Sequence, residues 1–282
     1  MERAVSRDGT EIGFSRSGAG PALLLVHGTT ADRRRWDGVV PALDEYFTVY
    51  AMDRRGRGLS GDAGEYSIVR EAEDVAAVIE AIGGLVSVLA HSYGAACSLE
   101  ASLLTDKMAR LILYEPPLPT GLPMYPPGTP DRMQALLDQG ERELALEMFF
   151  REVVRMPEDE LRAFRELPMW QRRIALTHTL PREMVIDRLY RFDPERFSHL
   201  QVPTLLMLGG DSPEIFRRPI EALEKALPVN RVVVLPGQGH AAMDAGRELF
   251  LREVMGFLME DRPAGEGGAI AREGADGTSR LE

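Results

Sequence analysis

Short, almost uninterrupted runs of apolar residues recur along this chain, and segments with helical periodicity lie between them. Such runs are typical of strands that are covered on both faces, as in parallel sheets. Helical spacing is clearest at 69–82, where Val75, Val78 and Ile82 share one face. This alternation predicts an α/β fold with a doubly wound, mostly parallel sheet. The expected strands are 22–26, 47–52, 85–89, 111–114, 204–208 and 232–235.

One interval interrupts the alternation. Between Leu118 and about Leu200 no strand is evident, and a proline-rich turn leads into helical patterns at 141–154 and 157–167. We therefore expect an all-helical insert at 118–200, between two core segments at 1–117 and 201–261. Residues 262–282 are rich in Gly, Ala and charge, with almost no large apolar side chain. This composition predicts a disordered tail.

Charge and cysteine content narrow the class of protein. The 282 residues include 33 Lys and Arg and 44 Asp and Glu, which gives a net charge of −11. This negative charge argues against nucleic acid as a partner. The single cysteine, Cys97, excludes an internal disulfide and a cysteine-based metal cluster, so we expect no metal and no cofactor. No apolar run is long enough for a membrane span, and no signal peptide is visible. We expect a cytoplasmic protein that acts on a small molecule, and the sequence leaves its oligomeric state open.

The strongest local signal is the segment Ala90-His91-Ser92-Tyr93-Gly94. It follows an expected strand and precedes a helix rich in small residues, so the chain must turn sharply at Ser92. Such a turn exposes the serine hydroxyl at a helix N-terminus, where backbone N–H groups favour negative charge. Ser92 is the candidate nucleophile; the alternative, on this segment alone, is an ordinary serine in a tight turn.

A second loop supports the catalytic interpretation. His27-Gly28-Thr29 follows the first long apolar strand, and Gly28 allows the backbone to turn there. The N–H groups of Thr29 and Tyr93 could then form a two-donor oxyanion hole. We interpret His27 as a residue that shapes this loop.

The general base is assigned to His240, which lies in a glycine-rich loop after the last apolar strand. A serine hydroxyl needs such a base because it is almost wholly protonated at neutral pH. A carboxylate must orient the imidazole. Asp211 is the favoured acid because it follows a strand about one strand–helix unit before His240, and Glu115, at the end of another strand, is the alternative.

These residues resemble the α/β-hydrolase superfamily. The resemblance rests on the order Ser92, Asp211, His240, on the His27-Gly28 loop, and on Asp53-Arg54-Arg55-Gly56-Arg57-Gly58-Leu59-Ser60, which is similar to a D-x-R-G-x-G-x-S segment of its single-domain members. It covers about residues 8–260 and implies that 118–200 is a helical cap over the active site. Four residues are candidates for an apolar pocket, with plain packing as the alternative for each: Trp36, Met169, Trp170 and His178.

The expected function is a cofactor-free serine hydrolase that cleaves a carboxylic ester or a lactone through an acyl-enzyme. Hydrolysis of a C–C bond in a diketone, or a biosynthetic thioesterase or cyclase activity, would use the same residues. A ligand receptor or pseudoenzyme that keeps the pocket but turns over little is the alternative from another class.

Overall fold

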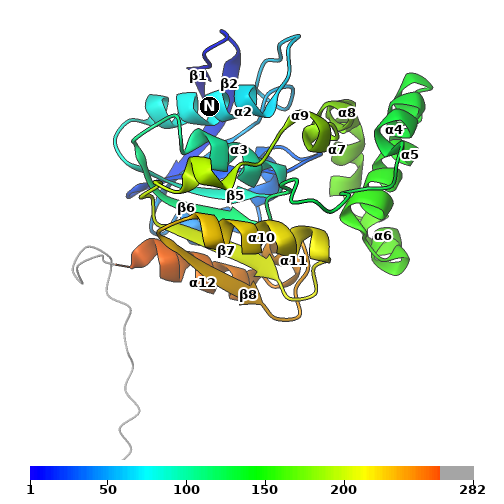
Figure 1. Ribbon diagram of the computed structural model, residues 1–282. Helices are drawn as coiled ribbons and strands as arrows, with labels where there is room; N and C mark the ends of the chain where they lie inside the picture. Colours follow the sequence, from blue (N-terminus) through cyan, green and yellow to red (C-terminus); the bar gives the residue numbers. More distant parts are fainter. Residues whose placement is uncertain (261–282) are drawn as a thin grey trace, which may run out of the picture.

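An eight-stranded sheet runs through the centre of the molecule (Figure 1). The structure, a computed structural model, describes residues 1–260, so the predicted tail at 262–282 lies outside the described residues. The strand order is β1-β2-β4-β3-β5-β6-β7-β8. β1 and β2 are antiparallel to their neighbours, and β3 to β8 are parallel. The strands are β1 (Glu2–Val5), β2 (Glu11–Gly18), β3 (Ala22–Val26), β4 (Thr48–Met52), β5 (Val86–His91), β6 (Met108–Tyr114), β7 (Thr204–Gly209) and β8 (Asn230–Leu235).

The predicted fold class is confirmed, and the six expected strands agree with β3 to β8. The sequence did not indicate β1 and β2. β1 is mostly exposed, and β2 is buried only at Ile12–Phe14 and is polar over its second half, so neither forms a continuous apolar run. The parallel strands differ because successive side chains enter different hydrophobic clusters on the two faces of the sheet. Leu24 and Val26 belong to one cluster, and Leu23 and Leu25 to the other.

Helices cover both faces. The cluster that contains Leu24 also holds side chains of α2 (Ile68–Ile82), α3 (Tyr93–Ala101) and α10 (Glu214–Ala226). The cluster that contains Leu23 holds side chains of η1 (Arg33–Trp36), α1 (Val40–Leu43), α11 (Ala242–Ala245) and α12 (Arg247–Met259). The expected helix at 69–82 is α2, and the Ser67 hydroxyl caps it by accepting a hydrogen bond from the Arg70 N–H. The sheet is therefore doubly wound, as predicted.

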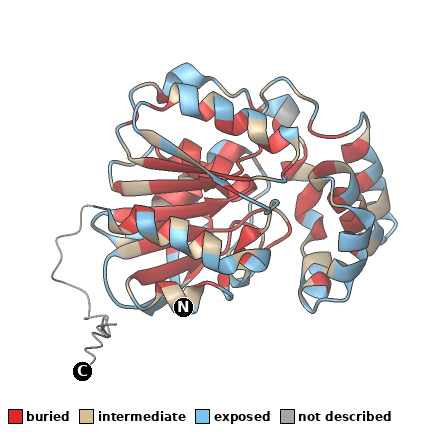
Figure 2. Ribbon diagram, turned by 90° about the horizontal axis from the view of Figure 1, so that it is seen from below, coloured by how far each residue is buried: buried red, intermediate tan, exposed pale blue. Residues whose placement is uncertain are grey.

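Helices fill the chain between β6 and β7. Within the described residues this interval contains no strand, and residues 118–200 are called the cap below. Figure 2 shows the cap helices to one side of the sheet layer. That the cap forms a separate domain stays a prediction. The elements are α4 (Thr129–Asp138), α5 (Arg142–Met148), η2 (Phe149–Val154), α6 (Glu158–Arg165), α7 (Met169–Ala175), η3 (Thr177–Thr179), α8 (Leu180–Glu183), α9 (Ile186–Leu189) and η4 (Pro194–Phe197).

Buried ion pairs join the cap to the core. Glu183 at the end of α8 accepts hydrogen bonds from Arg54, at 2.7 Å, and from Arg57. Arg54 also donates to Glu71 of α2 through two nitrogens, at 2.7 and 2.5 Å. All four side chains are almost fully buried. Removing one member would leave a buried charge without its partner, so this cluster fixes the position of the cap.

No helix among residues 1–260 is both long and apolar enough to cross a membrane.

Candidate active site

Ser92 occupies a strained turn between β5 and α3. Its φ of 54° and ψ of −128° lie in a region that non-glycine residues rarely adopt. The turn is held by a hydrogen bond from the Ser92 N–H to the Tyr114 carbonyl oxygen, at 2.8 Å. Small neighbours make it possible: a methyl group on Gly28 would lie 2.8 Å from Ser92 Cβ, and one on Gly94 would overlap the His27 carbonyl oxygen. The sharp turn that was expected at Ser92 is therefore present between β5 and α3.

The two expected oxyanion donors lie beside Ser92. Tyr93 is the first residue of α3, and N–H groups in the first turn of a helix have no acceptor within that helix. Thr29 directly follows Gly28, whose Cα packs against the side chain of Ser92. The two residues therefore lie on different elements that both adjoin Ser92.

His240 contacts Glu115, not Asp211. His240 Nδ1 forms a short hydrogen bond with Glu115 Oε2, and the Glu115 side chain is fully buried. Glu115 Oε1 accepts a hydrogen bond from the Gly209 N–H, at 2.6 Å, so both carboxylate oxygens are held. With Nδ1 donating to Glu115, Nε2 keeps a lone pair that can accept a proton. This is the orientation that a general base requires.

The expectation that Asp211 orients His240 is corrected by this geometry. Asp211 is exposed, and its N–H donates to the Gln238 carbonyl oxygen, at 3.0 Å. It is the second residue after β7. Glu115 is the first residue after β6 and adopts a left-handed φ of 50°. The sequence offered one signal for Glu115, its position directly at the end of a strand, but the spacing of Asp211 and His240 was given more weight.

Aromatic residues position the His240 loop. The Phe216 ring stacks on the imidazole, with centroids 4.1 Å apart, and the Tyr114 hydroxyl donates to the Gly239 carbonyl oxygen. His91 Nε2 lies 2.7 Å from the His240 carbonyl oxygen, and the two rings are 4.6 Å apart. Burial, with the nearby charge of His240, holds the pKa of His91 well below its usual value. A neutral His91 that donates to this carbonyl is therefore part of the support for His240. The sequence did not single out Phe216 or Tyr114, and His91 was treated there only as the variable position of the serine turn.

Ser92 and His240 are not joined by a direct hydrogen bond within the described residues. Within residues 1–260 no hydrogen bond joins the Ser92 hydroxyl to the imidazole, although His91, the neighbour of Ser92, contacts His240. Hydrogen bonds of catalytic groups often tighten only when substrate is present. The site also gathers no metal ligands: no cluster of three or more His, Cys, Asp or Glu suited to a metal ion occurs among residues 1–260.

The four residues expected to line an apolar pocket occupy different places. Trp36 is fully buried among side chains of α12 and the sheet. Trp170 packs in the cap against Phe150 and Phe164 and donates to Glu143 Oε1, at 2.8 Å. Among the four, only Met169 lines a described cavity, the small one between cap and core. His178 is exposed, and its Nε2 lies 3.1 Å from the Gly56 carbonyl oxygen.

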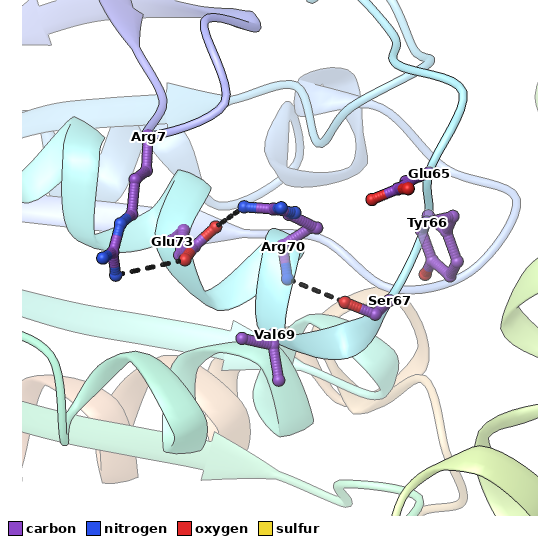
Figure 3. A pocket seen from close by; sticks show the side chains of 7 residues that line it. All are labelled: Arg7, Glu65, Tyr66, Ser67, Val69, Arg70 and Glu73. Carbon is purple, nitrogen blue, oxygen red and sulfur yellow. Dashed lines mark hydrogen bonds and ion pairs between the residues drawn. The ribbon is translucent and has the colours of Figure 1, made fainter.

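The largest pocket described lies away from this site. It measures about 680 Å³ and opens beside the N-terminal half of α2, where Arg7 and Arg70 flank Glu73 (Figure 3). None of the expected site residues lines it. Its walls are mostly charged or polar, and neither Ser92 nor His240 lines it. The candidate catalytic residues Ser92, Glu115 and His240 instead follow the carboxyl ends of β5, β6 and β8.

Residues 23–253 match the alpha/beta hydrolase family. The chain belongs to this family. An alpha/beta hydrolase from Sphaerobacter thermophilus has a similar structure, with 37% sequence identity and a TM-score of 0.77 over 88% of this chain and 100% of that one. The chain is 29% identical to the N-formylmaleamate deformylase of Pseudomonas putida, over 84% of this chain and 88% of the relative. It is 28% identical to a pimeloyl-[acyl-carrier protein] methyl ester esterase of Aeromonas hydrophila, over 88% and 99%. The family resemblance seen in the sequence is confirmed, and the chain is a hydrolase by family.

Proposed function

We propose that this alpha/beta hydrolase cleaves a carboxylic ester through an acyl-enzyme on Ser92, with His240 as general base and Glu115 as the acid that orients it. The observation that carries the proposal is the contact between His240 Nδ1 and the buried Glu115 carboxylate, close to a strained serine turn. A pseudoenzyme would have no need to keep this costly arrangement of a buried carboxylate and a strained backbone.

In the proposed reaction, Ser92 Oγ attacks the ester carbonyl carbon while His240 Nε2 takes the hydroxyl proton. The N–H groups of Thr29 and Tyr93 stabilise the negative oxygen of the tetrahedral intermediate. Collapse of the intermediate breaks the bond to the leaving alcohol, which receives the proton from His240. Water, activated by the same imidazole, then releases the carboxylic acid and restores Ser92. Glu115 stabilises the imidazolium that forms in each half-reaction.

The relatives support acyl transfer but differ in the bond that their names describe. One is an esterase that acts on a methyl ester, and the other is a deformylase. Both are compatible with a serine nucleophile and an oxyanion hole. An activated ester is the first substrate to test, since its good leaving group reports Ser92 chemistry whichever natural bond is cleaved.

The proposal is tested by labelling and turnover. A fluorophosphonate probe should modify the wild-type protein at Ser92, and Ser92→Ala should lose both the label and p-nitrophenyl ester hydrolysis, with kcat lower by about 10⁶. Ser98→Ala is the matched control: Ser98 is also buried in α3, and its hydroxyl has no hydrogen-bond partner among the described residues. Equal labelling of the Ser92→Ala variant, found by mass spectrometry at another residue, would refute the assignment.

A further inference from the structure

Arg173 of α7 reaches from the cap to the loop that carries Thr29. One of its terminal nitrogens donates to the Thr30 hydroxyl at 2.9 Å, the Thr30 carbonyl at 3.2 Å and the Thr29 carbonyl at 3.4 Å. The guanidinium also lies over the rings of Phe150 and Phe164, 5.5 and 5.3 Å from their centroids. All these partners are uncharged. Among the ion pairs of residues 1–260, none includes Arg173, whereas Arg34 and Arg35, which lie nearby in the core, pair with Asp32 and Asp244.

Arg35 faces the same place from the core. Its side chain is only 4% exposed, and one terminal nitrogen pairs with Asp244 at 2.8 Å. Its Nε is buried and has no hydrogen-bond partner within the described residues. A buried donor without an acceptor costs free energy, so it marks a position where an acceptor would be favourable.

The two arginines line one cavity between cap and core. It has a volume of about 30 Å³, room for about two water-sized groups. Four arginines line it: Arg34, Arg35, Arg172 and Arg173. Asp32 is the acid in its wall, and Arg34 already holds it through Nε, at 3.0 and 3.2 Å from the two oxygens. The cavity therefore carries an excess of positive charge in a protein whose net charge is −11.

The burial of Arg173 affects its charge. Burial, followed by the charge of Arg35, lowers the pKa of Arg173 to about 9. Arginine in proteins normally stays charged far above this range, so Arg173 is a cation in need of an anion. It remains protonated at neutral pH.

The cavity adjoins the loop that packs on Ser92. Thr30, which Arg173 contacts, lies two peptide units from Gly28, and Gly28 packs on Ser92. Two peptide units span at most about 8 Å, a distance that a short acyl chain bridges. Arg173 also binds the Thr29 carbonyl oxygen, on the loop whose Thr29 N–H is one of the two proposed oxyanion donors.

We propose that Arg173 and Arg35 form a binding site for a carboxylate at the far end of the substrate's acyl group. The substrate class is then an ester of a short dicarboxylic acid, with one carboxyl esterified and the other free. Arginine suits this role because its planar fork can donate two parallel hydrogen bonds to one carboxylate. The inference rests on the proposed function for its link to catalysis, but the binding step can be measured without turnover.

A purely structural role for Arg173 makes a different prediction. If its bonds to Thr30 only anchor the cap, substitution would slow neutral and anionic substrates alike. The discriminating quantity is therefore the ratio of kcat/KM between two esters with acyl groups of the same length. Mono-p-nitrophenyl glutarate and p-nitrophenyl valerate are such a pair, since each has a five-carbon acyl group and only the first carries a free carboxylate.

We expect the wild-type protein to favour the glutarate ester by about 10- to 100-fold in kcat/KM. Arg173→Met, which retains an apolar stem against the two phenylalanine rings, should remove most of that preference. Arg35→Gln tests the cavity from the core side and should reduce the preference without altering the cap. Arg162→Gln is the control, because Arg162 is an exposed cap arginine on α6 outside the cavity. It should keep the wild-type ratio.

Binding is measured separately by thermal unfolding with glutarate, and with glutaramide as the uncharged counterpart. Glutarate should raise the melting temperature of Ser92→Ala, and the Arg173→Met exchange in that background should abolish the rise. If the kcat/KM ratio of the two esters is the same in the wild-type protein, Arg173→Met and Arg35→Gln, the carboxylate site is overturned. The proposed serine hydrolase activity is not affected by that result. If the wild-type protein hydrolyses neither ester, while glutarate still raises the melting temperature in a way that depends on Arg173, only the proposed function is overturned. No glutarate shift in the Ser92→Ala protein would also overturn the site.

Discussion

At the scale of single residues, the acid is where the sequence and the structure differ. Asp211 and Glu115 both follow strands of one parallel sheet, so both strand ends open toward the loop of His240. One-dimensional spacing cannot tell which side chain turns inward. The structure separates them by burial: Glu115 is enclosed and bonded through both oxygens, whereas Asp211 is exposed.

Exchange of each carboxylate for its amide tests this assignment. Glu115→Gln keeps the shape but donates where it must accept, so the imidazole is held in the wrong tautomer and kcat should fall by about 10⁴. Asp211→Asn should change kcat less than about threefold, since exposed substitutions away from special contacts have small effects. Steady-state kinetics on a p-nitrophenyl ester gives both numbers. Circular dichroism must first show that each variant is folded. A large loss in Asp211→Asn alone would return the role to Asp211.

At the scale of elements, the sequence predicted what periodicity encodes. The parallel strands and α2 followed from their apolar patterns, because burial on two faces leaves a clear signature. The serine turn followed from small residues on both sides of Ser92. Arg173 could not be found in this way: its place depends on how α7 docks onto the Thr29 loop, and no local pattern encodes the packing of a cap on a core. The same holds for Glu183 and its arginine partners.

The close packing of α3 on the Thr29 loop gives a prediction with a matched pair of glycines. Gly94→Ala places a methyl group against the His27 carbonyl oxygen, so it should destabilise the protein by about 1–3 kcal/mol and lower kcat by pushing the oxyanion loop from Tyr93. Gly256→Ala in α12 meets nothing within 4 Å and should stabilise the helix by about 1 kcal/mol. Urea unfolding measures both changes. Two variants of equal stability would show that the strand–helix contact is looser than described.

At the scale of the whole molecule, the core keeps two histidines neutral. His27 Nε2 accepts the Arg54 N–H at 3.1 Å and its Nδ1 lies 2.8 Å from the Gly28 carbonyl oxygen, an arrangement that only the neutral ring with a proton on Nδ1 can satisfy. Burial and the charges of Arg54 and Arg57 hold the pKa of His27 well below its usual value of 6.5. His91 is buried with the same direction of shift. Both histidines lie beside Ser92, so a fall in pH destabilises the interior of the protein there.

The sign of the resulting pH dependence follows from proton uptake. Below pH 6.5 the unfolded chain protonates both histidines while the folded chain does not, so the free energy of unfolding falls as the pH falls. Each group contributes about 1.4 kcal/mol per pH unit. Asp74 acts in the opposite direction, because burial raises its pKa to about 6 even though Arg55 bonds to it. Between pH 7 and 5 these three groups together predict a loss of about 2–3 kcal/mol.

Urea unfolding at pH 7 and pH 5 measures this loss. His27→Asn keeps a donor near the Gly28 carbonyl but cannot be protonated, so the loss between the two pH values should become about 2 kcal/mol smaller. His199→Asn is the control, since His199 is exposed and its exchange should leave the pH dependence as it is. A His27→Asn protein that loses as much stability as wild type would mean that His27 takes up its proton in the folded state, and the loop beside Ser92 would then have to accommodate a charged imidazole next to Arg54 and Arg57.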